Sequence, residues 1–267
     1  MPFRLKPTFR DALARADRPL AGMWVCSGSP LIAEICAGAG LDWLLIDMEH
    51  SPNGLESVLA QLHAAAAAPV TTLVRVPTAD PVIIKQVLDL GAQNLLVPMV
   101  SSAAEAEAIV RAVHYPPRGI RGVGSALARS ARWNRVDDYL AEAEQHVSLV
   151  VQIETAAGVE AAAAIAAVDG VDGVFVGPSD LAASMGLLGQ QTHPDVVAAV
   201  RRVFTQARAS GTPVGVNAFD PALARDYAEA GADFLLAGAD VALLARGSEA
   251  LATAWVPEAD RTARAGY

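Results

Sequence analysis

Eight short apolar runs recur along the chain, and each ends just before polar, glycine or proline residues. Most of these runs are continuously apolar rather than alternating, which is typical of parallel strands buried on both faces. The expected strands are Leu20–Cys26, Trp43–Asp47, Thr71–Val76, Asn94–Pro98, Ser148–Glu154, Gly173–Val176, Pro213–Val216 and Phe234–Ala237. This pattern places the chain in the α/β class.

Segments rich in Ala, Leu, Glu and Gln separate these runs and favour helices. The expected helices include Asn53–Ala66, Asp80–Leu90, Ala103–Val113, Thr155–Ala166 and Pro221–Ala230. Most strand ends follow one another after about 21 to 28 residues, and insertions at 115–146 and 183–195 lengthen two intervals. An eight-fold repeat of this kind predicts one (β/α)8, or TIM, barrel over residues 1–267. A doubly wound open sheet is the alternative, but no glycine-rich dinucleotide fingerprint follows the first strand.

Charge and apolar length exclude several classes of partner. The 267 residues include 29 Asp and Glu against 20 Lys and Arg, a net charge of −9, which argues against nucleic acid and anionic membranes. No apolar stretch approaches the roughly 20 residues of a membrane span, and the first residues lack the apolar region of a secretory signal. Cys26 and Cys36 suggest reduced thiols rather than a disulfide framework. We therefore expect a cytoplasmic protein.

A TIM barrel carries its active site at the carboxyl ends of its strands, so polar residues at those positions are candidates. These candidates are Asp47, Glu49, His50, Arg75, Gln152, Glu154, Gly177, Pro178, Ser179, Asp180 and Asn217. Glu154 and Asp180 follow neighbouring strands, so their carboxylates can meet and bind a hard cation such as Mg²⁺ or Mn²⁺. The alternative for each is simple capping of the helix that follows.

Three further features of the strand ends allow two interpretations each. His50 can transfer protons near neutral pH, or it can be a histidine bonded to its acidic neighbours. A buried Arg75 needs an anionic partner, either a substrate carboxylate or enolate, or Glu49. The 177–180 turn opens a helix, whose first N–H groups donate either to a bound carboxylate or to an ordinary capping side chain.

The insertion at 115–135 is rich in arginine and follows the fourth predicted strand. A long loop in a compact domain is often a lid or a binding loop. We therefore expect it to lie over the active-site face or in an interface, with one or more arginines meeting an anionic aldehyde substrate. The sequence does not decide which of these touches substrate: Arg118, Arg121, Arg129 or Arg132.

Several stretches together resemble one known family. They are LDWLLIDMEHSPN (41–53), VRVP (74–77), KQVLDLGAQNLLVPMV (85–100), YPPRGIRGVGSALARSARWN (115–134), VQIET (151–155) and VGPSDLAASMG (176–186). The chain resembles the HpcH/HpaI aldolases, which are class II pyruvate aldolases. Within that family it is most similar to the branch of 4-hydroxy-2-oxoheptanedioate and 2-keto-3-deoxy-sugar-acid aldolases.

The resemblance implies a metal site and a pyruvate site. Glu154 and Asp180 would hold a divalent cation, Mg²⁺, Mn²⁺ or Co²⁺, with no organic cofactor. Pyruvate would chelate that cation through its carboxylate and keto oxygens, and Arg75 would contact the keto oxygen. The 177–180 turn, chiefly the N–H groups of Ser179 and Asp180, would hold the pyruvate carboxylate, and Gln152 would line the same pocket.

The resemblance also implies an acid–base system shared between subunits. His50 would act with a metal-bound water that Asp47 and Glu49 orient. The partner of His50 would be Asp89, which precedes the fourth strand and so reaches an active site only from a neighbouring subunit. The family therefore suggests a homohexamer, a trimer of dimers, in which the last helices around Ala239–Ala254 swap between partners.

The expected activity is reversible aldol cleavage of a 4-hydroxy-2-oxo acid to pyruvate and an aldehyde. Lys6 and Lys85 are the only lysines, and neither ends a strand, so a Schiff-base aldolase is disfavoured. Two alternatives remain: a lyase of acyl-CoA substrates such as malyl-CoA, and a non-catalytic protein that binds 2-oxo acids. The first alternative needs a nucleotide pocket, and the sequence has no basic run outside 118–135.

Overall fold

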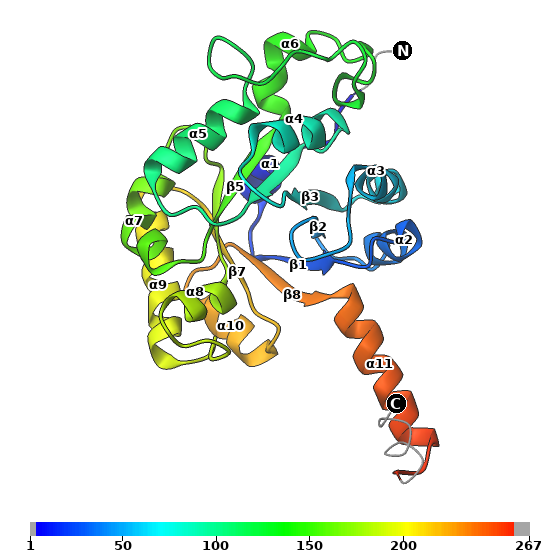
Figure 1. Cartoon of the computed structure of the whole chain (residues 1–267), viewed down its shortest axis with the longest axis vertical. Helices are drawn as coiled ribbons and strands as arrows, with labels where there is room; N and C mark the ends of the chain where they lie inside the picture. The colour runs from blue at the N-terminus through cyan, green and yellow to red at the C-terminus, as the bar shows by residue number, and fades with distance from the viewer. Residues whose placement is uncertain (1–3, 259–267) are drawn as a thin grey trace.

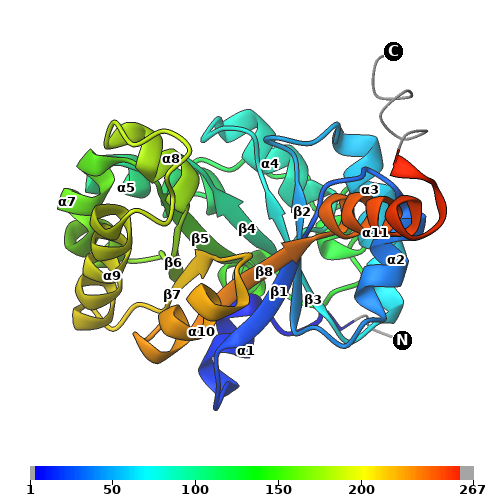
Figure 2. The same cartoon turned by 90° about the horizontal axis from the view of Figure 1, so that it is seen from below.

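The computed structural model describes residues 4–258, and eight parallel strands within them close into a barrel in chain order (Figures 1 and 2). The strands are β1 (Leu20–Val25), β2 (Trp43–Asp47), β3 (Thr71–Arg75), β4 (Asn94–Val97), β5 (Ser148–Ile153), β6 (Gly173–Val176), β7 (Val214–Asn217) and β8 (Phe234–Ala239). This confirms the predicted TIM barrel and excludes the open sheet, because β8 pairs with β1. Each predicted strand agrees with the observed one to within two residues at either end.

Helices alternate with the strands, and most of them cover the outside of the barrel. They are α1 (Phe9–Arg15), α2 (Pro30–Ala37), α3 (Leu55–Ala64), α4 (Pro81–Asp89), α5 (Ala103–Val113), α6 (Tyr139–Glu142), α7 (Ala156–Ala166), α8 (Pro178–Ser184), α9 (Pro194–Ala209), α10 (Pro221–Glu229) and α11 (Asp240–Trp255). Local sequence explains where several of them begin. The side chains of Asp80 and Asp220 accept hydrogen bonds from first-turn N–H groups of α4 and α10, and a proline follows each as the first helical residue.

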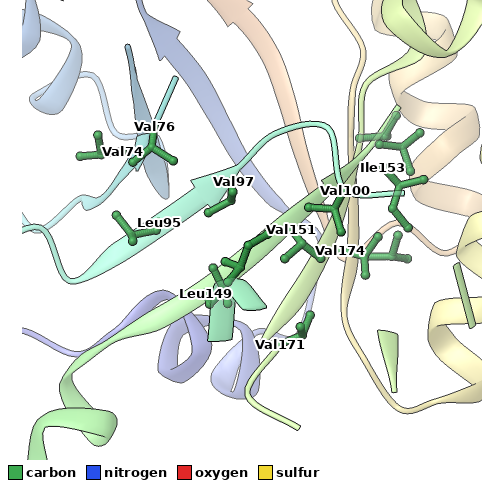
Figure 3. Close-up of a cluster of buried hydrophobic side chains, with 14 of the residues drawn as sticks. Val74, Val76, Leu95, Val97, Val100, Leu149, Val151, Ile153, Val171 and Val174 are labelled. Atoms are coloured by element: carbon green, nitrogen blue, oxygen red, sulfur yellow. The ribbon is translucent and has the colours of Figure 1, made fainter. Parts of the chain in front are cut away.

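The core has two layers. Side chains on one face of the strands fill the space beneath the helices, as Val74, Leu95, Val97 and Val151 do (Figure 3). Side chains on the other face fill the barrel interior with bulky residues, and Phe9 of α1 packs among them. The Phe9 N–H donates to Asn94 Oδ1 at the start of β4 (2.7 Å), so α1 closes the amino-terminal end of the barrel. The carboxyl-terminal end is left for chemistry.

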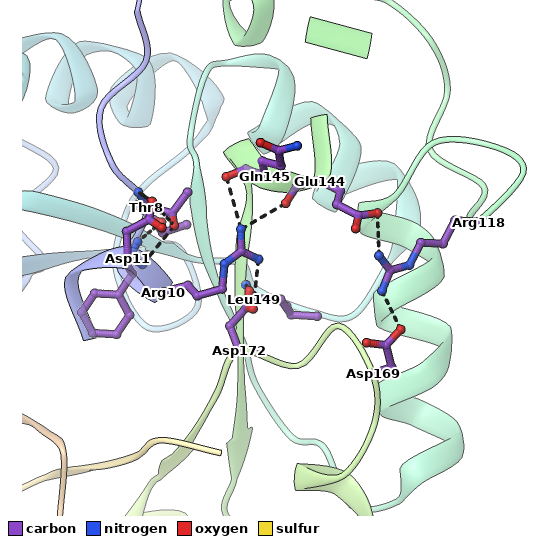
Figure 4. Close-up of polar contacts among 11 residues, drawn as sticks. Thr8, Arg10, Asp11, Arg118, Glu144, Gln145, Leu149, Asp169 and Asp172 are labelled. Carbon is purple, nitrogen blue, oxygen red and sulfur yellow. Dashed lines mark hydrogen bonds and ion pairs between the residues drawn. The ribbon is translucent and has the colours of Figure 1, made fainter. Parts of the chain in front are cut away.

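The 115–146 insertion lies at the amino-terminal end of the barrel, so the expectation that it covers the active-site face is wrong for its own subunit. The reason is that it follows α5, which carries the chain back to that end, rather than following β4 directly. Arg118 forms ion pairs with Glu144 and Asp169, while Arg10 of α1 bonds Asp172 (Figure 4). These contacts fasten the insertion beneath the barrel. Its place in an interface stays a prediction.

The last helix, α11, leaves the barrel and projects away from it (Figures 1 and 2). Val241, Leu244, Leu251 and Trp255 recur at helical spacing on one side of it and are exposed, with exposed fractions of 45% to 82%. An exposed apolar stripe of this length is unusual on a monomer. Separately, no helix among the described residues is both long and apolar enough to cross a membrane.

Candidate active site

Arg75 is the centre of a charged cluster at the carboxyl ends of β2 and β3. The two strands pair in register with Asp47 opposite Arg75, so both side chains reach the same end of the barrel. Arg75 Nε lies 2.7 Å from Asp47 Oδ1, and Nη1 lies 2.9 Å from Glu49 Oε2. The guanidinium also stacks on the Trp24 ring, 4.2 Å from its centroid. Arg75 is only 5% exposed, so both carboxylates and the ring hold it in one orientation.

Asp47 organises the turn that follows β2. It accepts hydrogen bonds from the Glu49 and His50 N–H groups and from the Ser51 hydroxyl, besides its ion pair with Arg75. Burial acts to raise the pKa of Asp47, but Arg75 and these hydrogen bonds outweigh it and hold the pKa below its ordinary value. Asp47 is therefore an ionised anchor for Arg75 and for the loop that carries Glu49 and His50.

Glu154 follows β5 and is almost fully buried. Its Oε1 accepts the Met99 N–H at 2.8 Å, and its Oε2 accepts from Gln152 Nε2 at 2.5 Å. A side chain at Gly177 would collide with this carboxylate, because an added Cβ would stand 2.6 Å from Glu154 Oε2. The glycine before the Pro178 turn thus lets β6 approach Glu154 closely.

The charge around Glu154 fits a bound cation. Burial, above all, raises the pKa of Glu154 to about 7, and the negative charges of Glu49 and Asp180 add to this rise. Burial likewise raises the pKa of Glu49, although Arg75 and His50 act in the opposite direction. The negative charges of Glu49 and Asp180 thus act on the Glu154 carboxylate, and a divalent cation bound through oxygen ligands would balance this charge.

The structure also limits the kind of metal site. Within residues 4–258, no group of three or more His, Cys, Asp or Glu side chains is close enough to enclose a metal ion. Glu154 and Asp180 alone would leave the other coordination positions to water and substrate oxygens, as Mg²⁺ sites commonly do. A catalytic site with open positions is therefore compatible with this donor set, and a closed structural site is not.

His50 and the α8 turn border the same end of the barrel. The His50 side chain is 65% exposed, and its Nε2 lies 3.9 Å from Glu49 Oε2. Its exposure leaves it free to exchange protons with solvent or substrate. Ser179 and Asp180 occupy the first turn of α8, where N–H groups have no intrahelical acceptor.

Comparison with known proteins decides the family. The family model described as HpcH/HpaI aldolase/citrate lyase matches residues 20–247, which includes every strand of the barrel. The chain belongs to the HpcH/HpaI family. It is 50% identical over 262 residues to a Salmonella dublin protein named 4-hydroxy-2-oxo-heptane-1,7-dioate aldolase, covering 98% of this chain and 99% of that one.

Two solved structures show the same fold, and one of them carries the family's name. A crystal structure of an HpcH/HpaI aldolase/citrate lyase family protein from Burkholderia cenocepacia superimposes with a TM-score of 0.88 at 42% identity, covering 92% of this chain and 97% of that one. The citrate synthase SbnG is more distant, with a TM-score of 0.82 and 28% identity over 92% of this chain and 97% of its own.

The structure does not bring Asp89 to His50 within one HpcH/HpaI subunit. Asp89 ends α4 at the amino-terminal end of the barrel, where its Oδ1 lies 3.0 Å from Arg121 Nη2. Arg121 is buried beneath the Tyr115 ring. Arg129 donates to the Leu90 carbonyl at the same end. The arginines of the insertion are thus remote from Glu154 in their own subunit.

Sequence reasoning missed Trp24, which supports Arg75 from β1. Its Nε1 donates to Asn217 Oδ1 at 2.8 Å, so the ring is fixed by β7 as well as by packing. Trp24 stands one residue before the end of β1, at the carboxyl end of its strand like the other site residues. That position was the available signal, but an aromatic side chain in an apolar run is typical of a core residue.

Proposed function

We propose that this HpcH/HpaI family member is a divalent-metal-dependent pyruvate aldolase that reversibly cleaves 4-hydroxy-2-oxo acids. The preferred substrate would be 4-hydroxy-2-oxo-heptane-1,7-dioate, which gives pyruvate and succinic semialdehyde. The observation that carries the proposal is the buried Arg75, held by Asp47 and by Glu49, whose charge also acts on the buried carboxylate of Glu154. The Salmonella dublin relative, which is 50% identical, supports the choice of substrate.

The chemistry requires one carbon–carbon bond to break and one proton to move. The 4-hydroxyl loses its proton, the bond between C3 and C4 breaks, and C3 of the resulting pyruvate enolate takes a proton. Negative charge develops on the 2-oxo oxygen, and the fixed guanidinium of Arg75 would stabilise it. A divalent cation held by Glu154 and Asp180 would add Lewis-acid polarisation of the same oxygen. Gln152 and the Gly177–Asp180 turn would position the carboxylate of the 2-oxo acid.

His50 would serve as the proton-transfer group, with Glu49 beside it. Replacing His50 with Ala should lower kcat by roughly 10²–10⁴-fold, the usual contribution of a general base. The melting temperature should not change, because the side chain is largely exposed and its Nε2 lies 3.9 Å from Glu49 Oε2, beyond hydrogen-bond distance. Loss of solvent deuterium exchange at the pyruvate methyl group would report the same step without an aldehyde. Unchanged exchange in His50→Ala would assign the proton transfer to another group.

The direct test is cleavage of 4-hydroxy-2-oxo-heptane-1,7-dioate by purified protein supplied with Mg²⁺, Mn²⁺ or Co²⁺. Pyruvate can be measured with lactate dehydrogenase, and a panel of aldehydes with pyruvate would define the second substrate. Metal-dependent pyruvate release supports the proposal. Cleavage of malyl-CoA in preference to hydroxy-oxo acids would reassign the protein as an acyl-CoA lyase. Binding of pyruvate without methyl-proton exchange would make it a binding protein.

We infer in addition that the active form is a homo-oligomer, a hexamer built from three dimers. The exposed apolar stripe of α11 would pack against a second copy, because neither end of the barrel covers it in one chain. Asp89 of one subunit would then approach His50 of its neighbour. The Asp89–Arg121 ion pair would fix the orientation of that carboxylate from its own subunit.

Lysine substitutions on the α11 stripe should break this assembly. Leu244→Lys and Leu251→Lys bury a charge in the proposed interface, so light scattering should report smaller particles and activity should fall with them. Glu249→Gln is the control, because it changes the charge by the same amount on the opposite side of α11. It should leave the particle size and the activity unchanged. If the stripe variants keep the mass of the parent protein, α11 is not the contact. Restored activity on mixing His50→Ala with Asp89→Asn subunits would show that sites are shared.

A further inference from the structure

A second cavity lies at the amino-terminal end of the barrel, away from the catalytic cluster. It has a volume of about 580 Å³ and is bordered by Thr71 and Asn94, the first residues of β3 and β4. Arg75 stands at the other end of β3, four residues along the strand, which corresponds to roughly 13 Å. Within one subunit the cavity is therefore separate from the charged cluster around Arg75.

The cavity is lined by five cationic side chains: Arg4, Lys6, Arg15, Arg129 and Arg132. None of the described residues that line it is acidic. This is a strong local excess of positive charge in a chain whose net charge is −9. A single-sign cluster in a concave site concentrates field lines and attracts ions of the opposite sign.

Two of these arginines converge on one point. A Cβ built on Gly91 would lie 2.7 Å from Arg129 Nη1 and 2.9 Å from Arg132 Nη1. Their observed acceptors are neutral: Arg129 donates to the Leu90 carbonyl, and Arg132 donates to the Arg129 carbonyl. Within residues 4–258 neither guanidinium forms an ion pair with a carboxylate. Two half-buried like charges held together in this way need an anion to balance them.

The titration behaviour agrees with this geometry. Burial, followed by the positive charge of Arg132, lowers the pKa of Arg129 to about 10. Burial also lowers the pKa of Arg132 and of Lys6 below their ordinary values. Lys6 donates to the Ala68 carbonyl, which holds its ammonium group at the cavity.

We propose that this basic cavity is a binding site for a small phosphoryl-bearing anion, separate from the active site. Guanidinium groups bind phosphate oxygens in a bidentate manner, and two adjacent forks with a lysine suit a ligand with several ionised oxygens. The volume lies within the range of small-molecule sites. Five cations exceed the charge of a dicarboxylate, which favours a phosphorylated ligand over the proposed dicarboxylic substrate.

Calorimetric titration with fructose 1,6-bisphosphate tests the proposal. The metal-loaded protein should be used with excess pyruvate present, so that the active site is occupied during the titration. We expect saturable binding with one site per chain, no binding of unphosphorylated fructose, and weaker binding of tricarballylate. Arg129→Gln should weaken the affinity for the bisphosphate roughly tenfold or more, as expected for a lost hydrogen bond to a charged group.

Arg201→Gln is the matched control, because it removes the same charge from an exposed arginine paired with Asp226 on the far helices. Its affinity for the bisphosphate should equal that of the parent protein. If Arg129→Gln fails to fold, Arg15→Gln removes an exposed cation from the same cavity and should weaken binding as well. The proposal is wrong if no saturable binding occurs, if Arg201→Gln weakens binding equally, or if tricarballylate binds more tightly than the bisphosphate.

Discussion

Glu154→Gln should abolish nearly all turnover and remove the response of the enzyme to added metal. The amide keeps the size of the side chain but loses the charge that would hold a divalent cation. Metal catalysis supplies several kcal/mol of transition-state stabilisation, so kcat should fall by roughly 10³-fold or more. The measurement is pyruvate release against metal concentration, with and without prior EDTA treatment. Asp180→Asn should behave in the same way.

This variant should fold normally, which separates a catalytic effect from a structural one. The Met99 N–H can still donate to the oxygen of the introduced amide, as it does to Glu154 Oε1 in the parent protein. Among residues 4–258 the buried Oε1 atom of Gln152 has no hydrogen-bond partner, so the Gln152 amide can turn and accept from the new side chain. Glu160→Gln, on the surface of α7, is the matched control and should keep full activity. Full turnover by Glu154→Gln or by EDTA-treated protein would contradict the proposed metal dependence.

The barrel was predictable because its signals are local and repeated. A run such as Trp43–Asp47 is apolar throughout, and Ala103–Val113 combines a serine cap with good helix formers, so both were predicted at their observed bounds. The closed eight-strand topology then brings polar residues at the strand ends together. Asp47 and Arg75 followed from that rule, since register places them opposite each other.

The prediction that was wrong concerns the end of the barrel at which a segment lies. The sequence places the 115–135 insertion after the fourth strand, which suggests the carboxyl-terminal end of the barrel. However, α5 lies between them and returns the chain to the amino-terminal end. Because the chain returns to this end, Arg129 and Arg132 lie next to Gly91 and line the basic cavity. No sequence motif predicts this cavity. Nor can one chain's sequence show what packs on α11 or which subunit meets Asp89, because those contacts depend on a second copy.

Arg75→Ala should have the second large effect, on both activity and stability. Arg75 forms ion pairs with two carboxylates and stacks on Trp24, and its side chain is 7% exposed. Its removal leaves the largely buried carboxylates of Asp47 and Glu49 without their cationic partner, which costs about 3–5 kcal/mol in comparable cases. Loss of a fixed charge facing a developing enolate should lower kcat by roughly 10²–10³-fold. Chemical denaturation and steady-state kinetics measure the two effects separately.

The pH dependence of the stability loss identifies its cause. In the parent protein Arg75 helps to hold the pKa of Asp47 below its ordinary value. Ionised Asp47 therefore stabilises the fold at pH values above its unfolded pKa of about 3.9, and this stabilisation is lost as the pH falls. In Arg75→Ala burial acts without that compensation, so the Asp47 pKa rises and acidification relieves the buried charge. The difference in unfolding free energy between the two proteins should therefore be largest near neutrality and shrink toward pH 4. Arg75→Lys keeps a charge without the guanidinium fork, so it should recover part of the stability but little of the activity. A stability difference that does not change with pH would mean that lost packing on Trp24, rather than the two carboxylates, accounts for the destabilisation.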